Sequence, residues 1–278
     1  MTVSTADPNA ALAAKYPNLP VKFPLSLDSD LFERSALVEL AEALPEHLVE
    51  YNGGNVPRSV RPEDVPAPTL SVRKTIEQIG EAQSWMMLRN VEHHAAYAEL
   101  IDETLDRLKS TLQSVTGRMV RREGFVIVSS PSATTPLHFD EDHNILIQVE
   151  GRKTVTVYSQ EDRSVTSQVE LERFHAGGHR NISWKRDMDE KGMAFDLAPG
   201  DALYIPPMAP HYVQVSDEGP AFSFSMTWRS VKSQKIRYLH QLNHSLRKKG
   251  RKPKFPGASP LGDQAKIIKA GIERRLGL

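Results

Sequence analysis

The stretch that decides the fold is TPLHFDEDHNILIQVEGRKTVTVY, residues 135–158. It holds two runs of β-forming residues on either side of a turn at Gly151. Further short runs of this kind occur between Arg118 and Ser230, separated by Gly, Pro, Asp and Ser: RREGFVIVSS, DALYIPP, HYVQVSD and AFSFSMTW. Several short strands at such spacing predict an antiparallel sandwich or barrel.

The region before these strands has mainly helical periodicity. Residues 31–49 and 95–116 carry apolar side chains at helical spacing. A Pro- and Gly-rich loop is expected over 50–70 and a short buried strand over 85–91. Residues 1–30, rich in Pro, Ala and Ser, predict an extended or partly mobile lead-in.

Helical spacing returns after Ser230, where apolar residues share one face: Ile236, Leu239, Leu242 and Leu246. The chain is therefore expected to be mostly β with flanking helices. The predicted parts are a largely helical N-terminal extension packing on the core (1–117), a β core (118–230) and a basic helical C-terminal segment (231–278).

Composition narrows the possible functions. The 278-residue chain has no cysteine, which excludes disulfides, zinc–thiolate sites and a cysteine nucleophile. Its formal net charge is zero, so nucleic acid is not a favoured partner. The start of the sequence does not resemble a signal peptide, and no apolar run has the ~20 residues of a membrane helix. We expect a cytoplasmic protein that does not contact a membrane.

The C-terminal segment is strongly basic. Residues 231–254 contain nine Lys and Arg and no Asp or Glu. A solvated face beside a dimerisation helix is the simpler interpretation, and contact with an acidic partner is the alternative.

His138 and Asp140 form the first candidate site. Side chains two apart on a strand point to the same face, so both can aim at one point. Imidazole and carboxylate are ligands of non-haem Fe(II), which takes a second histidine as the third ligand. His211 begins a later strand, after the Pro-rich turn PPMAP, and can supply it. A lone H-x-D is a weak signal, since His138 could also be a surface histidine in a turn.

Lys153 strengthens the prediction. By strand parity it faces the same way as Val155 and Val157. A lysine on an apolar face is costly unless it meets an anion, although a side chain that reaches out at a strand end is the alternative. With Thr135 near the same end of the predicted barrel, Lys153 would hold the far carboxylate of a dicarboxylate co-substrate.

On residues 135–158, with PGDALYIPPMAPHYVQV (199–215) and FSFSMTW (222–228), the chain resembles the cupin-like, JmjC-type Fe(II)/2-oxoglutarate oxygenases. The resemblance implies a double-stranded β-helix, or jelly-roll, core. It implies that the metal is held, and catalysis carried, by His138, Asp140 and His211. It places the C5 carboxylate of 2-oxoglutarate on Lys153 and Thr135.

The likeness is strongest to the asparaginyl hydroxylases of that family. It implies that Asn144 lines the pocket near the co-substrate, and it places Met226 where those enzymes have a second asparagine, which would change the polarity of the pocket. It also implies a homodimer through the C-terminal helices.

The implied reaction uses Fe(II), 2-oxoglutarate and dioxygen. 2-Oxoglutarate is decarboxylated to succinate while a protein or peptide side chain, or a small molecule, is hydroxylated or demethylated. The sequence does not identify that substrate. The alternative is a non-catalytic cupin that binds a ligand in the pocket and contacts a partner through its basic C-terminal segment.

Lesser roles are predicted for the neighbouring polar residues. His143 has the parity opposite to His138 and is not expected to bind the metal. Glu141 and Asp142 are most simply exposed turn acids. His175 and His179 are expected in a loop, because two glycines separate them, and Arg180 in that loop is a candidate for substrate contact.

Overall fold

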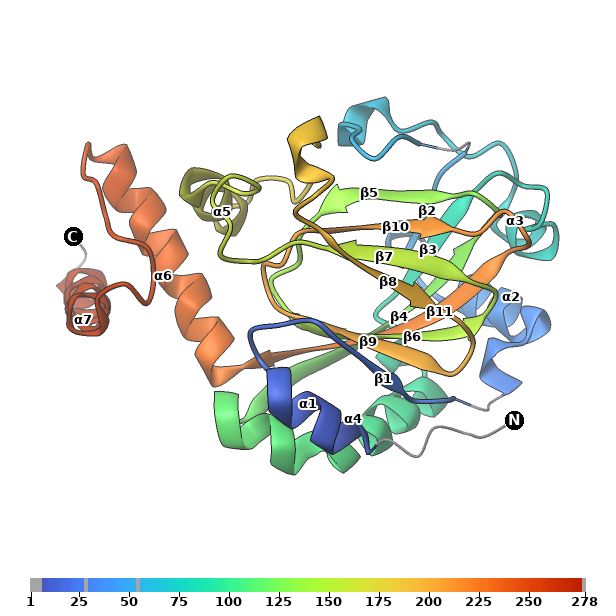
Figure 1. The fold of residues 1–278 in the computed structure, drawn as a ribbon, viewed down its shortest axis with the longest axis horizontal. Helices are drawn as coiled ribbons and strands as arrows, with labels where there is room; N and C mark the ends of the chain where they lie inside the picture. Colours follow the sequence, from blue (N-terminus) through green and yellow to red (C-terminus); the bar gives the residue numbers. More distant parts are fainter. Residues whose placement is uncertain (1–6, 28–29, 54–55, 277–278) are drawn as a thin grey trace.

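Two antiparallel sheets form the core of the protein (Figure 1). The computed structural model describes residues 7–27, 30–53 and 56–276. In spatial order the larger sheet contains β1 (Val21–Pro24), β9 (Asp201–Ile205), β6 (His143–Glu150), β11 (Ala221–Ser230), β4 (Met119–Ser129), β3 (Trp85–Arg89) and β2 (Val49–Tyr51). The smaller sheet contains β5 (Thr134–His138), β10 (His211–Val215), β7 (Lys153–Val157) and β8 (Met193–Leu197).

The two sheets face each other across an apolar layer. Leu146 and Leu203 of the larger sheet pack against Val155 and Val213 of the smaller one. This arrangement confirms the predicted jelly-roll core, with the space between the sheets open to side chains from both.

The alternation of side chains along β11 shows that the two faces of the larger sheet lie in different environments. Phe224, Met226 and Trp228 are fully buried in the core that the sheet forms with the helices. Ser225 and Thr227 point the other way, into the space between the sheets. The side-chain period of two therefore separates an apolar outer face from a polar inner face.

Helices from the N-terminal part cover that outer face (Figure 1). They are α1 (Pro8–Lys15), α2 (Arg34–Ala43), α3 (Val72–Glu77) and α4 (Ala95–Thr116). The long helix α4 follows the predicted 95–116 and buries Ile101, Leu105 and Leu108. It approaches β4 closely at Gly124, where a Cβ would lie 2.6 Å from Cδ1 of Ile101.

The N-terminal part departs from the prediction in two places. It contributes β1, β2 and β3 to the larger sheet, and only β3 was expected. The expected lead-in over 1–30 is instead structured over 7–27, where α1 and β1 lie; residues 1–6 and 28–29 fall outside the described residues. Strand β1 is held by its pairing with β9, a long-range contact that local composition does not reveal. The boundary at 117/118 stays a prediction.

The C-terminal helices extend away from the sheets (Figure 1). Helix α6 (Val231–Lys248) packs against α5 (Gln168–His175), where Arg247 pairs with the buried Glu172 and Gln241 donates to the carbonyl of His175. Helix α7 (Pro260–Leu276) lies beyond α6. Across the described ranges, no helix is both long and apolar enough to cross a membrane.

The turn between β6 and β7 places Lys153. Gly151 has φ of 70°, and a Cβ there would lie 2.1 Å from the carbonyl oxygen of Pro220. Only glycine fits such a conformation without strain. The chain thus passes from the larger to the smaller sheet and starts β7 at Lys153.

Candidate active site

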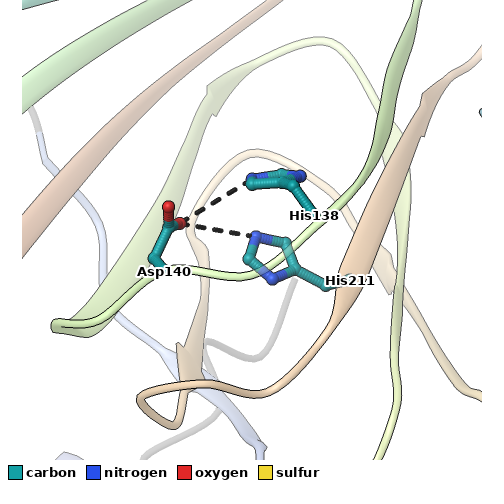
Figure 2. A group of neighbouring side chains, drawn as sticks. All are labelled: His138, Asp140 and His211. Carbon is teal, nitrogen blue, oxygen red and sulfur yellow. Dashed lines mark ion pairs between the residues drawn. The ribbon is translucent and has the colours of Figure 1, made fainter. Parts of the chain in front are cut away.

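Three predicted side chains converge at one end of the space between the sheets (Figure 2). His138 ends β5, Asp140 follows it, and His211 begins β10, which pairs with β5 so that the two histidines are direct neighbours. Asp140 Oδ2 lies 3.7 Å from His138 Nε2 and 3.8 Å from His211 Nε2. Among the described residues, this is the only group of three or more His, Asp or Glu whose ligand atoms lie within 4.8 Å of one another.

Backbone carbonyls fix the orientation of both rings. Nδ1 of His138 lies 2.7 Å from the carbonyl oxygen of Pro136, and Nδ1 of His211 lies 3.0 Å from that of Ala209. A carbonyl oxygen can only accept, so each Nδ1 carries the proton and each Nε2 keeps its lone pair. Both lone pairs are thus available to a metal beside Asp140, as in metal sites where an outer partner fixes the tautomer.

The ionisation states also suit a cation. Burial and the neighbouring His211 lower the pKa of His138 to about 3, and burial likewise lowers the pKa of His211. Burial alone would raise the pKa of Asp140, but Arg180 and the two histidines outweigh it and hold that pKa well below its usual range. The site therefore presents two neutral imidazoles and one carboxylate.

Arg180 belongs to the site, although the sequence suggested contact with a substrate. Its Nη1 donates to Asp140 Oδ1 at 2.7 Å, which leaves Oδ2 directed at the histidines. The loop that carries Arg180 is held against β5, since Phe139 N donates to Arg180 O and Ile182 N donates to Leu137 O. No sequence pattern relates Arg180 to Asp140, because the contact depends on how this loop folds back.

Lys153 lies in the same cavity and is buried, with an exposed fraction of 4%. Within the part of the chain that the structure describes, its ammonium makes no hydrogen bond or ion pair. Burial lowers the pKa of Lys153 to about 7. A buried ammonium without a partner is costly, so this position calls for an anionic ligand. Thr135 lines the cavity as well, on the neighbouring strand β5.

Asn144 and its neighbours on β11 form the polar inner wall. Ser225 Oγ donates to Asn144 Oδ1 at 2.6 Å, which leaves the amide NH₂ of Asn144 for a ligand. Thr227 pairs with Asn144 across the strands, and its buried hydroxyl has no hydrogen-bond partner among the described residues.

Met226 was expected to alter the polarity of the pocket, and this is wrong. Its side chain is fully buried in the core on the helix side of the larger sheet. Ser225 and Thr227 are the residues of β11 that reach the cavity.

Glu141 and Asp142, which follow Asp140, are not the exposed turn acids that the sequence predicts. Glu141 and Asp142 are largely buried, with side-chain exposures of 18% and 15%, and Arg229 binds both carboxylates. Arg237 of α6 also pairs with Glu141, at 3.0 Å. Burial raises the pKa of Asp142 to about 6, although Arg229 opposes the shift. This network fixes the segment that follows the candidate metal-binding carboxylate of Asp140.

Two further histidines, His143 and His175, lie outside the triad. His143 is buried away from the triad, as expected, although it begins β6 of the larger sheet and is not on the strand of His138: it bonds Tyr204 and Ser230 and stacks on Trp228. His175 is the last residue of helix α5 and not a loop residue. The glycines at 177 and 178 follow the helix and end it, so His175 and His179 do not share a helical face.

The cavity that contains the triad has a volume of about 460 Å³. Beyond Lys153 and the triad it continues along the inner face of β3 and β4, over Trp85, Met87 and Phe125. Charged side chains surround this part, and they come in pairs: Arg89 with Glu50 and Arg121 with Glu123. The N-terminal strands β2 and β3 therefore contribute to the cavity, which the sequence did not indicate.

Comparisons with known proteins agree with this architecture. The model of the JmjC domain family matches residues 97–236. Jumonji C domain-containing protein 5 of Drosophila melanogaster is 34% identical over 106 residues, which are 35% of this chain and 26% of that protein. Lysine-specific demethylase JMJ30 of Arabidopsis thaliana is 34% identical over 96 residues, which are 30% of this chain and 21% of that protein. The matches thus span about a quarter of the length of these relatives.

A solved structure shows the same fold over nearly the whole chain. The match to the structure of E. coli ycfD covers 98% of this chain and 69% of the ycfD chain, with a TM-score of 0.56 and 17% sequence identity.

The jelly-roll core with its His-Asp-His group defines a cupin-type fold that carries a candidate metal site. Within that fold class, the chain belongs to the JmjC domain family. The closer likeness to asparaginyl hydroxylases stays a prediction.

Proposed function

We propose that this protein is an Fe(II)- and 2-oxoglutarate-dependent oxygenase that hydroxylates a side chain of a protein or peptide. One observation carries the proposal: three metal-ligand atoms and a buried, unpartnered lysine lie in the same cavity. The first group suits the metal and the second suits the co-substrate.

The triad fits Fe(II) in the chemistry of its donors. Two imidazoles and one carboxylate on one side of an ion are the ligand set of non-haem Fe(II) oxygenases, which leaves the opposite side for other ligands. Ligands about 2.1 Å from an ion lie within about 4.2 Å of each other. The Asp140 Oδ2 distances of 3.7 and 3.8 Å to the two Nε2 atoms satisfy this limit.

The strand register supports a role for Lys153 at the far end of a dicarboxylate. Val157 pairs with His211, and Lys153, four residues before Val157 in β7, pairs with Val215, four residues after His211 in β10. At roughly 3.3 Å per residue this separates the two positions by about 13 Å along the sheet. A five-carbon diacid chelated at the triad, together with the length of the lysine side chain, spans this distance.

Each polar group would then have a defined partner. Lys153 and Thr135 hold the C5 carboxylate, and the free amide of Asn144 donates to an oxygen of the co-substrate. Bound Fe(II) supplies the activation of dioxygen, coupled to decarboxylation of 2-oxoglutarate to succinate. The apolar layer beside the site, with Val155 and Val213, keeps the reacting centre dry.

Side chains on β3 and β4 are placed to hold the substrate. Trp85, Met87 and Phe125 give an apolar surface next to the triad, and the charge pairs around them can bond a polar backbone. Hydroxylation of an N-methyl group would give a hemiaminal, whose C–N bond breaks to release formaldehyde and leave N–H, so demethylation is the same chemistry on a different substrate.

The experiment that tests the proposal is turnover of 2-oxoglutarate without added substrate. The protein is mixed with Fe(II), ascorbate and 2-oxoglutarate in air, and succinate is quantified by NMR. We expect succinate from the native protein and none above background from His211→Ala. Equal succinate from both, or none from either, would contradict the proposal and leave a non-catalytic cupin that only binds a ligand.

We further propose that the protein forms a homodimer through α7. Large apolar side chains are exposed on this helix at positions four and seven apart: Leu261, Ile268 and Ile272 are 88%, 53% and 52% exposed. Such a stripe on one face of a helix is typical of an interface. The expected cytoplasmic location stays a prediction.

A further inference from the structure

A second cavity, of about 210 Å³, lies behind the acidic network of the active site. Helices α5 and α6 and the chain around Phe255 enclose it, and Glu141 lies in the wall of both cavities. Its apolar lining includes Leu171, Ile236 and Phe255. Neither the metal nor 2-oxoglutarate needs this space.

Two buried histidines face the second cavity with ring nitrogens that make no hydrogen bond to the described residues. The rings of His175 and His240 stack with centroids 4.9 Å apart, and the residues are 7% and 1% exposed. Both ring nitrogens of His175 and Nδ1 of His240 lack a hydrogen bond within the described chain. The closest carboxylate oxygen, Oε2 of Glu141, is 3.5 Å from His175 Nδ1 and is already bound by Arg237. Buried polar atoms are rarely left unpaired, so these nitrogens indicate a missing ligand.

The surroundings of the histidines are electropositive. Arg163 lies over the ring of Phe255 at 4.3 Å and lines the cavity together with Arg237 and Lys232. Lys232 is exposed and makes no hydrogen bond or ion pair with the described residues. Burial, followed by the charges of His175, Arg163 and Lys266, lowers the pKa of His240 to about 3.

Helix α6 adds to this potential. Ser230, Lys232 and Ser233 of its first turn line the cavity, and a helix N-terminus favours negative charge. The acids that face the cavity are Glu141, which its arginines neutralise, and the exposed Glu161. The balance of charged groups around the second cavity therefore favours the binding of an anion.

Size and lining define the ligand further. A cavity of about 150 Å³ can hold benzene, so about 210 Å³ accommodates a molecule of roughly ten non-hydrogen atoms. We propose that the second cavity binds a small, largely apolar organic acid. Its carboxylate lies between the two histidines and the first turn of α6, and its apolar part packs on Leu171 and Phe255. This site is additional to the proposed oxygenase function.

Benzoate and its uncharged isostere benzamide are suitable probes. The metal-free protein, labelled with ¹³C in its histidine rings, is titrated with each compound and followed by NMR. We expect benzoate to shift the resonances of His175 and His240 with saturation, and benzamide to bind at least tenfold more weakly. Equal binding of the two, or no binding of benzoate, would overturn the inference.

Variants locate the site. His240→Phe keeps a ring for stacking but removes the nitrogens. We expect it to bind benzoate at least tenfold more weakly, as measured from the NMR resonances of His175. Lys232→Gln changes only an exposed side chain, so folding is unaffected, and a threefold or larger loss is expected. His244→Phe, one turn further along α6 and outside the cavity lining, is the matched control and should bind as the native protein does.

A final variant separates the two cavities. Lys153→Met removes the cation of the first cavity, and benzoate binding should be unchanged in it. Loss of binding there, or native affinity in both His240→Phe and Lys232→Gln, would place benzoate elsewhere and refute the site. Because the titration needs neither iron nor turnover, its outcome is independent of the oxygenase proposal.

Discussion

At the scale of single residues, Lys153 is the most informative side chain. Strand parity alone placed it beside Val155 and Val157, and the structure confirms that all three are buried. The same rule led us to expect His138 and Asp140 on one side and His143 on the other, and the three residues do lie so, but β5 ends at His138 and the connection to β6 sets the positions of Asp140 and His143. Arg180 and the unpaired hydroxyl of Thr227 could not be predicted, because their roles depend on contacts between segments far apart in the sequence.

Replacing Lys153 tests its assigned partner. Lys153→Met keeps the length of the side chain and removes its charge, so we expect at least tenfold weaker binding of 2-oxoglutarate with metal binding retained. Calorimetry on the Co(II)-loaded protein measures both. 2-Oxobutyrate, which lacks the C5 carboxylate, is the matched ligand and should lose no affinity; a parallel loss would show a general disturbance of the cavity.

The pH dependence of co-substrate binding follows from the same residue. Burial lowers the pKa of Lys153 from 10.5 to about 7, so in the free protein the ammonium loses its proton as the pH rises above that value. The 2-oxoglutarate dianion binds the protonated form of Lys153. Its affinity should therefore fall by up to about tenfold for each pH unit above 7. Titrations between pH 6 and about 9 check this slope. In Lys153→Met the slope should vanish, and a slope that persisted would assign it to another group.

At the scale of elements, strand β11 shows that side-chain alternation predicts which residues line the cavity better than the family resemblance does. The likeness to asparaginyl hydroxylases placed Met226 in the pocket. Yet Met226 has the same parity as Phe224 and Trp228, which are core residues on the helix side. Alternation on the strand was therefore the better guide to the pocket lining.

Substitutions in β11 can verify this register. Met226→Asn buries an amide in an apolar core, so the free energy of unfolding should fall by roughly 2–5 kcal/mol. Met226→Leu conserves volume and should cost less than about 1.5 kcal/mol. Urea unfolding measures both. If Met226→Asn were as stable as Met226→Leu and changed the affinity for 2-oxoglutarate, Met226 would line the pocket after all.

Elements differed in how far the sequence revealed them. Helix α4 and the strands β4, β6, β7, β9, β10 and β11 carry regular patterns and were predicted within a few residues, whereas β5 and β8 of the smaller sheet were not among the predicted strand runs. Strands β1 and β2 have four and three residues, too few for a pattern, and exist because they pair at the edges of the larger sheet. The predicted helix over 31–49 is shorter, α2 at Arg34–Ala43, since the chain turns at Pro45 and enters β2.

At the scale of the whole molecule, the jelly roll holds the candidate site while the C-terminal helices extend away from it (Figure 1). The basic segment of 231–254 is only partly a solvated face. Arg237 reaches back to Glu141 beside the triad, and Arg247 pairs with Glu172 of α5. The C-terminal segment is thus anchored to the catalytic part by ion pairs.

The proposed dimer has a direct test. The double variant Ile268→Glu with Ile272→Glu introduces charge into the exposed stripe of α7 and should be monomeric, with half the native mass by light scattering. Leu19→Glu is the control, because Leu19 is 50% exposed but lies far from α7 in the sequence. A native protein that is already monomeric, or a double variant that remains dimeric, would contradict an α7 interface.

The central claim is that His138, Asp140 and His211 hold an iron that oxidises 2-oxoglutarate with dioxygen. The most direct measurement is the reaction of the native protein with Fe(II) and 2-oxoglutarate under ¹⁸O₂, followed by mass spectrometry of the succinate. We predict succinate with one oxygen atom from the gas, and no labelled succinate from His138→Ala. Labelled succinate from that variant, or unlabelled or no succinate from the native protein, would contradict the account.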